Sequence, residues 1–136
     1  MTPLTWGAAW AAAVVTAMAL DALWFGLIAG RFYRRHLGAI MADHLGWPAA
    51  MAFYVLFGGG LLYFCVDPAL RSGSPGYAAL NGAALGLLVY GTYDLTNLAV
   101  LSDWDGKVAA ADVLWGVFFS AATSCAAYGA GTVVLT

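Results

Sequence analysis

The stretch LTWGAAWAAAVVTAMALDALWFGLIA, from Leu4 to Ala29, is an apolar run in which Asp21 is the single formally charged residue. About 20 residues in helical conformation cross the roughly 30 Å hydrocarbon core of a bilayer. Lipid offers the backbone no hydrogen-bond partners, so an Ala- and Leu-rich segment of this length is expected to form a helix. No basic region precedes the run, which predicts a retained first transmembrane helix rather than a cleaved signal.

Three further apolar runs follow, at 48–66, 77–101 and 108–135. None shows the alternation of apolar and polar residues that marks the strands of an outer-membrane barrel. The predicted fold class is therefore all-α: a polytopic membrane protein with a compact bundle of four transmembrane helices. The helices are expected at about 4–29, 48–66, 77–101 and 108–135 of a single domain, 1–136.

The composition supports a membrane location, because 63% of the residues are hydrophobic and only 9% are charged. An ordinary soluble domain has about 25% charged residues. The formal net charge of -2 gives no reason to expect nucleic acid as a partner. Membrane lipids are the expected partners, together with another copy of the chain or a subunit of a membrane complex. We expect no metal and no cofactor, because the cysteines and histidines form no ligand cluster.

The basic residues predict an orientation. Arg31, Arg34 and Arg35 lie in the first connection and Lys107 in the third, against Arg71 alone in the second. Cytoplasmic connections carry an excess of Lys and Arg, so both termini are expected outside the cytoplasm. The first connection, 31–47, is amphipathic and is expected to lie along the interface, whereas the second, 67–76, is expected to be a turn. The three arginines are expected to contact lipid headgroups, or else to neutralise a buried acid.

Small residues recur at intervals of four in the third apolar run, at Ala78, Gly82 and Gly86. This spacing lets another helix approach the third one closely. Close approach of a ligand is the second interpretation.

Three carboxylic acids fall inside the predicted helices: Asp21, Asp94 and Asp112. An ionised Asp at the centre of an inserted helix costs about 2.5 to 3.5 kcal/mol. Desolvation disfavours the charged form, so we expect at least one of the three to be protonated near neutral pH. All three are expected in the cytoplasmic half of the membrane, where they can meet in one polar pocket.

The segment Tyr90 to Asn97 is the richest in polar groups. Residues three and four apart on a helix share a face, which places Tyr90, Asp94 and Asn97 in one row. Such a row can bind a polar head, pass a proton, or tie helices together by hydrogen bonds. These readings stay open at the level of sequence.

A tetrad occurs twice in the chain. Asp21-Ala22-Leu23-Trp24 lies in the first run and Asp112-Val113-Leu114-Trp115 in the fourth. Each tetrad places an indole three residues after a carboxyl group, on the same helical face. Because the first and fourth helices are expected to be antiparallel, the two tetrads can face each other in the same leaflet. Internal duplication and coincidence are both compatible with one such match.

The chain resembles a family of bacterial membrane proteins catalogued as domain of unknown function 2177. The resemblance covers essentially the whole chain and rests on four elements: Asp21-x-x-Trp24, Phe32-Tyr33, Tyr90-x-x-Tyr93-Asp94-Leu95-Thr96-Asn97 and Asp112-x-x-Trp115-Gly116. It implies a compact four-helix protein of the bacterial inner membrane, and it implies no activity.

The leading hypothesis is a site that binds or processes a small amphiphilic molecule, such as a lipid or a fatty-acyl compound. Tyrosine hydroxyls would donate hydrogen bonds and tryptophans would wall the pocket. An accessory subunit of a larger complex and a small proton-coupled carrier are the alternatives, and whether there is turnover is left open. The expected ligand-binding residues are Asp21, Trp24, Tyr90, Tyr93, Asp94, Asn97, Asp112 and Trp115.

Overall fold

The structure is a computed structural model that describes residues 1–136. All of its regular elements are helical, which confirms the all-α fold class. Two of the long helices contain a short π-helical segment, labelled η. The elements are α1 (Pro3–Leu23), η1 (Trp24–Ile28), α2 (Gly30–Leu37), α3 (Trp47–Leu61), η2 (Leu62–Val66), α4 (Asp67–Ser72), α5 (Pro75–Val100) and α6 (Gly106–Leu135).

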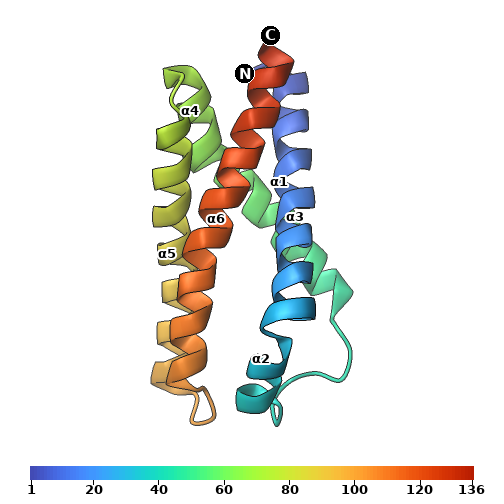
Figure 1. Ribbon diagram of the computed structural model, residues 1–136, viewed down its shortest axis with the longest axis vertical. Helices are drawn as coiled ribbons and strands as arrows, with labels where there is room; N and C mark the ends of the chain where they lie inside the picture. Colours follow the sequence, from blue (N-terminus) through green and yellow to red (C-terminus); the bar gives the residue numbers. More distant parts are fainter.

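The helices form four long antiparallel units (Figure 1). Both termini lie at one end of the molecule together with α4, and α2 and the turn between α5 and α6 lie at the other. The helix α6 occupies the middle of the bundle, where it packs most extensively against α5 and, on its other side, against α1. The first and third connections therefore share one end of the bundle, which we call the α2 end.

The packing of α5 against α6 depends on small residues. Ala78, Gly82 and Gly86 are buried along this interface. A Cβ atom added at Gly82 would lie 2.8 Å from the carbonyl oxygen of Ser120, so α5 and α6 approach too closely for a side chain there. The recurring small residues thus serve helix packing, the first of the two interpretations, and the helix that approaches is α6.

Three helical segments are long and apolar enough to cross a membrane: Pro3–Ile28, Trp47–Ser72 and Gly106–Leu135. The fourth long helix, α5, has 26 residues and is therefore about 39 Å long. It is less apolar than the other three because it carries polar side chains such as Asn81, Asp94 and Asn97. Packing against α6 buries some of these polar side chains, and Asp94 is fully buried.

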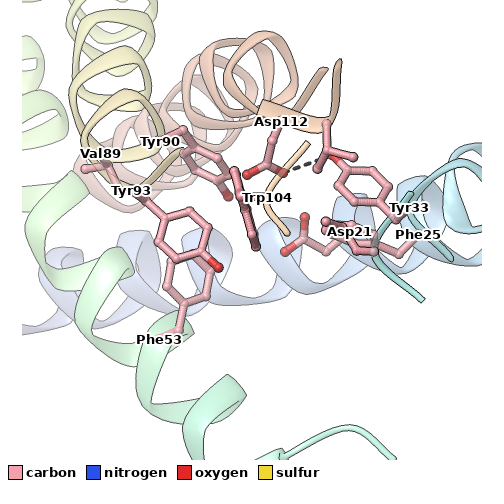
Figure 2. Close-up of a pocket in the computed structure, with 11 residues that line it drawn as sticks. Asp21, Phe25, Tyr33, Phe53, Val89, Tyr90, Tyr93, Trp104 and Asp112 are labelled. Atoms are coloured by element: carbon pink, nitrogen blue, oxygen red, sulfur yellow. Dashed lines mark hydrogen bonds between the residues drawn. The ribbon is translucent and has the colours of Figure 1, made fainter. Parts of the chain in front are cut away.

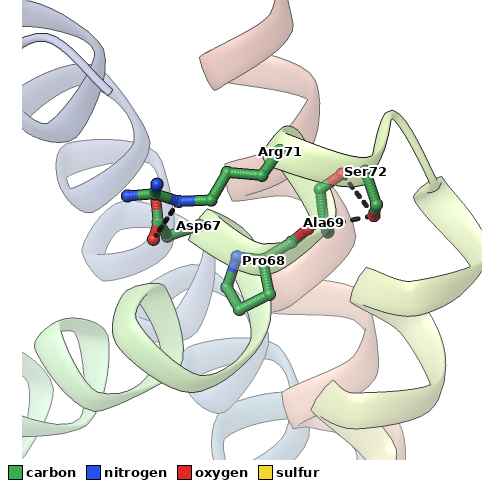
Figure 3. A network of polar contacts seen from close by, with 5 residues as sticks. All are labelled: Asp67, Pro68, Ala69, Arg71 and Ser72. Atoms are coloured by element: carbon green, nitrogen blue, oxygen red, sulfur yellow. Dashed lines mark hydrogen bonds and ion pairs between the residues drawn. The ribbon is translucent and has the colours of Figure 1, made fainter.

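The second connection differs from its prediction. The chain expected to turn at 67–76 continues as helix to Ser72, and the turn is confined to Gly73, which has a φ of 62°. Pro68 is tolerated because it stands in the first turn of α4. The π-helical segment η2 comes just before it, at the point where the proline ring would crowd the regular α-helical backbone. Side chains hold this end of the helix: the Nε atom of Arg71 donates to the carboxylate of Asp67 over 2.8 Å, and the hydroxyl of Ser72 donates to the carbonyl oxygen of Pro68 (Figure 3).

The first connection contains the short amphipathic helix that its sequence predicts, α2. Tyr33 and Leu37, one turn apart, are buried against the bundle, whereas Arg31, Arg34 and Arg35 are exposed. The helix α2 is therefore one wall of the bundle interior, with its basic side facing outward.

Candidate functional site

A cavity of about 480 Å³ lies at the α2 end of the bundle (Figure 2). Its wall draws on α1, η1, α2, α3, α5, α6 and the turn between α5 and α6, and nine of its 11 lining residues are hydrophobic. The lining residues are Asp21, Phe25, Tyr33, Leu37, Phe53, Val89, Tyr90, Tyr93, Trp104, Val108 and Asp112.

The cavity follows from the course of α3. This helix packs against α1, but it makes its contacts with α5 and α6 through η2, at its far end. The first half of α3 diverges from the rest of the bundle at the α2 end (Figure 1). Phe53 is the α3 residue that lines the cavity. This divergence leaves a space between α1, α3 and α5, and side chains from several helices line it.

Asp21 has a donor for each of its carboxyl oxygens. The hydroxyl of Tyr54 donates to Oδ2 over 2.9 Å, and the indole nitrogen of Trp115 donates to Oδ1 over 3.0 Å. These donors come from α3 and α6, so the carboxyl group of one helix joins three helices. This arrangement fixes the Asp21 side chain at the cavity wall.

Asp112 accepts a single hydrogen bond from the protein. The hydroxyl of Tyr33 donates to its Oδ1 over 2.9 Å, and that phenol oxygen accepts in turn from the indole nitrogen of Trp24 at 3.4 Å. Burial raises the pKa of Tyr33, which keeps the phenol protonated as a donor. The carboxyl group of Asp112 also lies against that of Asp94.

The two Asp-x-x-Trp tetrads face each other. The indoles of Trp24 and Trp115 stack with ring centroids 4.5 Å apart. Each tryptophan is connected to the aspartate of the other tetrad: Trp115 donates directly to Asp21, and Trp24 reaches Asp112 through Tyr33. The tetrads therefore form a crossed pair that fastens α1 to α6.

Asp94 lies behind the cavity, in the interface between α5 and α6. It is 0% exposed, and its carboxyl group lies next to that of Asp112. The indole nitrogen of Trp104 donates to its Oδ1 over 3.3 Å, and its Oδ2 has no partner. The three buried acids thus gather at one end of the bundle, but only Asp21 and Asp112 line the cavity.

The remaining expected site residues divide into two groups. Tyr90 and Tyr93 line the cavity, and no protein hydrogen bond engages their hydroxyl groups as donors. Asn97 lies one turn beyond Tyr93 and does not line the cavity. Trp24 and Trp115, expected to wall the pocket, do not line it either, because their rings cover each other. Their contribution is to hold the two cavity acids.

The arginines of α2 do not neutralise the buried acids. Arg31, Arg34 and Arg35 are exposed, and the one ion pair of the protein joins Arg71 to Asp67 at the opposite end. The alternative in which one of these arginines compensates a buried aspartate is therefore wrong. The reason is geometric: on α2 the face that turns inward carries Tyr33 and Leu37.

Sequence reasoning missed five aromatic residues of the site, one of which is Phe25 in the cavity wall. Tyr33 and Phe53 line the cavity, Tyr54 holds Asp21, and Trp104 donates to Asp94. The interval between Tyr33 and Leu37, two apolar residues one turn apart among arginines, was a usable signal that this face turns inward. Trp104 lies in the turn between α5 and α6, and its indole is half-buried and directed inward.

The chemistry available at the site is limited to carboxyl, phenol and indole groups. No group of three or more His, Cys, Asp and Glu side chains is placed to hold a metal ion. Cys65 is buried in η2, and Cys125 is exposed on α6; neither lines the cavity. The arrangement is suited to hydrogen bonding and to contact with apolar groups.

A family model described as predicted membrane protein (DUF2177) matches residues 6–129 of the chain. The match includes all four helical units and every residue of the cavity wall. The searches of curated proteins and of solved structures return no match.

Proposed function

We propose that the cavity of this chain, which belongs to the DUF2177 family of predicted membrane proteins, binds a small amphiphilic molecule from the bilayer. The observation that carries the proposal is an apolar cavity whose wall holds two carboxyl groups, those of Asp21 and Asp112. The proposed location is the bacterial cytoplasmic membrane, with both termini outside the cytoplasm and the α2 end facing it.

The size and lining of the cavity support this proposal. Binding sites for small molecules usually measure 300 to 1,000 Å³, with mostly hydrophobic walls and a few polar groups that orient the ligand. The present cavity, at about 480 Å³, has that character. The polar groups of the cavity lie at the α2 end of the bundle, which is expected near the headgroups of the cytoplasmic leaflet. An amphiphile would place its polar part there and its chain along the apolar wall.

The cavity wall also reaches the outside of the bundle. Phe25 is 41% exposed and Tyr93 is 53% exposed, although both line the cavity. A molecule dissolved in the bilayer can therefore approach between helices without crossing the core of the protein. The exposed basic face of α2 supports a further contact of Arg31, Arg34 and Arg35 with anionic headgroups.

A pair of adjacent substitutions on α5 tests the proposal. Val89→Trp places a large ring in the cavity, whereas Leu88→Trp adds the same ring on a side chain that is 66% exposed and does not line the cavity. Each protein would be purified with its lipids retained and analysed by mass spectrometry. We expect a defined amphiphile with wild type and Leu88→Trp, and its loss with Val89→Trp.

Two results would contradict the proposal. One is an identical set of retained molecules in all three proteins, which would mean that nothing occupies the cavity. The other is stoichiometric co-purification of a second polypeptide whose binding depends on the lipid-facing surface and not on Val89. That second result would favour an accessory subunit of a membrane complex.

A further inference from the structure

We infer that the polar part of the ligand is a cationic ammonium group. This inference rests on the proposed binding function and names the chemical class of its ligand. Three features of the cavity support it: the sign of its charges, the aromatic character of its wall, and the convergence of its polar groups.

The charge of the cavity wall is one-sided. Asp21 and Asp112 line it, and none of the five Lys and Arg residues of the chain does. The hydrogen bonds to these acids come from Tyr33, Tyr54 and Trp115, all uncharged donors. A cationic ligand would supply the missing charge, whereas a carboxylate or phosphate head would meet only acids.

Aromatic rings make up six of the 11 lining residues. Two pairs of rings form corners: Tyr93 and Trp104 are inclined at 88° with centroids 5.6 Å apart, and Phe25 and Tyr33 are inclined at 62°. In each pair the edge of one ring packs against the face of the other, and the outer π-faces that remain free can contact a group beside the pair. Ammonium groups bind against such faces through the ring quadrupole, as in the aromatic sites that recognise choline and methylated lysine.

The polar groups of the cavity wall converge on one space. Figure 2 shows the carboxyl groups of Asp21 and Asp112 and the hydroxyl of Tyr90 directed toward a common space. Asp21 has both oxygens occupied, so it contributes charge from a fixed position. Asp112 accepts from Tyr33, and its carboxyl group also lies against that of Asp94. An ammonium group would pair with the Asp112 carboxyl group while its carbon substituents contact the surrounding rings.

Three probes with the same chain and different heads test the inference: decyltrimethylammonium, decanol and decanoate. Binding would be measured by equilibrium dialysis of the protein in the uncharged detergent dodecyl maltoside. The Val89→Trp protein serves as the background, because its larger side chain is designed to block the cavity. Its signal measures the amount of probe that the detergent micelle takes up without the site. We expect decyltrimethylammonium to bind at least about tenfold more tightly than decanol, and decanoate to bind most weakly.

Substitutions then assign the selectivity to the cavity. Asp112→Asn is expected to weaken binding of the cation by about tenfold and to leave decanol unchanged, because it removes charge at constant shape. Tyr93→Leu should also weaken the cation more than decanol, because it removes a π-face. The matched control is Asp67→Asn, which removes a carboxylate at the opposite end of the bundle and should change neither affinity.

The outcomes distinguish this inference from the proposed function. Equal binding of decanol and the cation, or tighter binding of decanoate, would overturn the ammonium assignment and leave an amphiphile site in place. Binding of no probe above the Val89→Trp background would overturn both. If Asp112→Asn fails to fold, the ranking of the three probes on the wild-type protein still decides.

Discussion

The indole rings of Trp24 and Trp115 lie parallel, with centroids 4.5 Å apart and planes inclined by only 3°. The two residues are far apart in the sequence, in η1 and α6, and each is linked to the aspartate of the other tetrad. This stacked pair connects the outer helix α1 to the central helix α6 at the level of the cavity. The contribution of each of these contacts to the free energy of unfolding can be measured with single substitutions.

Trp115→Phe keeps an aromatic ring for stacking but removes the indole N–H that donates to Asp21. We expect the free energy of unfolding to fall by about 1 kcal/mol, because a half-buried acceptor loses one of its two donors. Denaturant titration of the protein in detergent, followed by near-ultraviolet circular dichroism, measures this change. Trp47→Phe is the control, since Trp47 is 58% exposed and makes no hydrogen bond through its indole. Equal effects of the two substitutions would contradict a role for the bond.

Gly116→Ala should displace the side chain of Tyr90, because an added Cβ would overlap its ring. The expected cost is about 1 to 3 kcal/mol of unfolding free energy, as for other overpacked interfaces. Gly59→Ala is the matched control: it is also helical, and an added Cβ there meets nothing within 4 Å. That control should be neutral or stabilising, because Ala favours helix over Gly. Thermal unfolding of both variants in the same detergent checks the difference.

Asp94→Asn should leave the protein as stable as wild type, or stabilise it by about 1 kcal/mol. The amide keeps an acceptor for Trp104 and replaces an oxygen that has no partner with a donor facing Asp112. Asp94→Leu should destabilise the protein, because it removes the acceptor for the indole of Trp104. Comparing the two unfolding midpoints tests whether hydrogen bonding or charge matters at this position. A large loss of stability in Asp94→Asn would show that the charge is required.

The orientation makes a separate prediction. Because both termini lie at one end of the bundle, reporters fused to the N- and C-termini should fall on the same side of the membrane. The distribution of basic residues predicts that this side is outside the cytoplasm. Alkaline phosphatase fused after Thr136 should therefore be active, and green fluorescent protein at that position should be dark. Replacing Arg31, Arg34 and Arg35 with Gln should weaken this preference.

Hydropathy predicted four long helices, and the structure has four long helical units, three of which are long and apolar enough to cross a membrane. The end of the second apolar run did not follow from hydropathy. The sequence 67–76 contains Pro, Ser and Gly and predicts a turn, but only Gly73 adopts a positive φ. Pro68 fits the first turn of a helix, where its missing N–H costs no hydrogen bond. Composition alone does not distinguish a proline that ends one helix from a proline that begins the next.

The candidate site was predictable as a set of residue types but not as a set of contacts. The intramembrane acids Asp21, Asp94 and Asp112 drew attention because burying a carboxyl group in lipid is costly. Which of them would line a cavity depended on how the helices pack. The shared face of Tyr90 and Asp94 turns toward α6, where Tyr90 lies against Gly116 and still reaches the cavity, while Asp94 is buried in the interface. The donor Tyr54 carried no comparable signal, because a single tyrosine in an apolar helix is common, and Tyr33 was marked only by its spacing from Leu37.

By itself, the sequence determined an all-helical membrane protein with three acids inside its apolar segments. It also determined the small residues that allow α5 and α6 to touch, since Gly82 and Gly86 leave no side chain between the backbones. The tertiary structure alone decided that Trp24 stacks on Trp115 and that the divergence of α3 opens a cavity. Hydropathy fixes how far a helix extends across the bilayer, whereas its rotation and tilt are set by packing against neighbours distant in the chain.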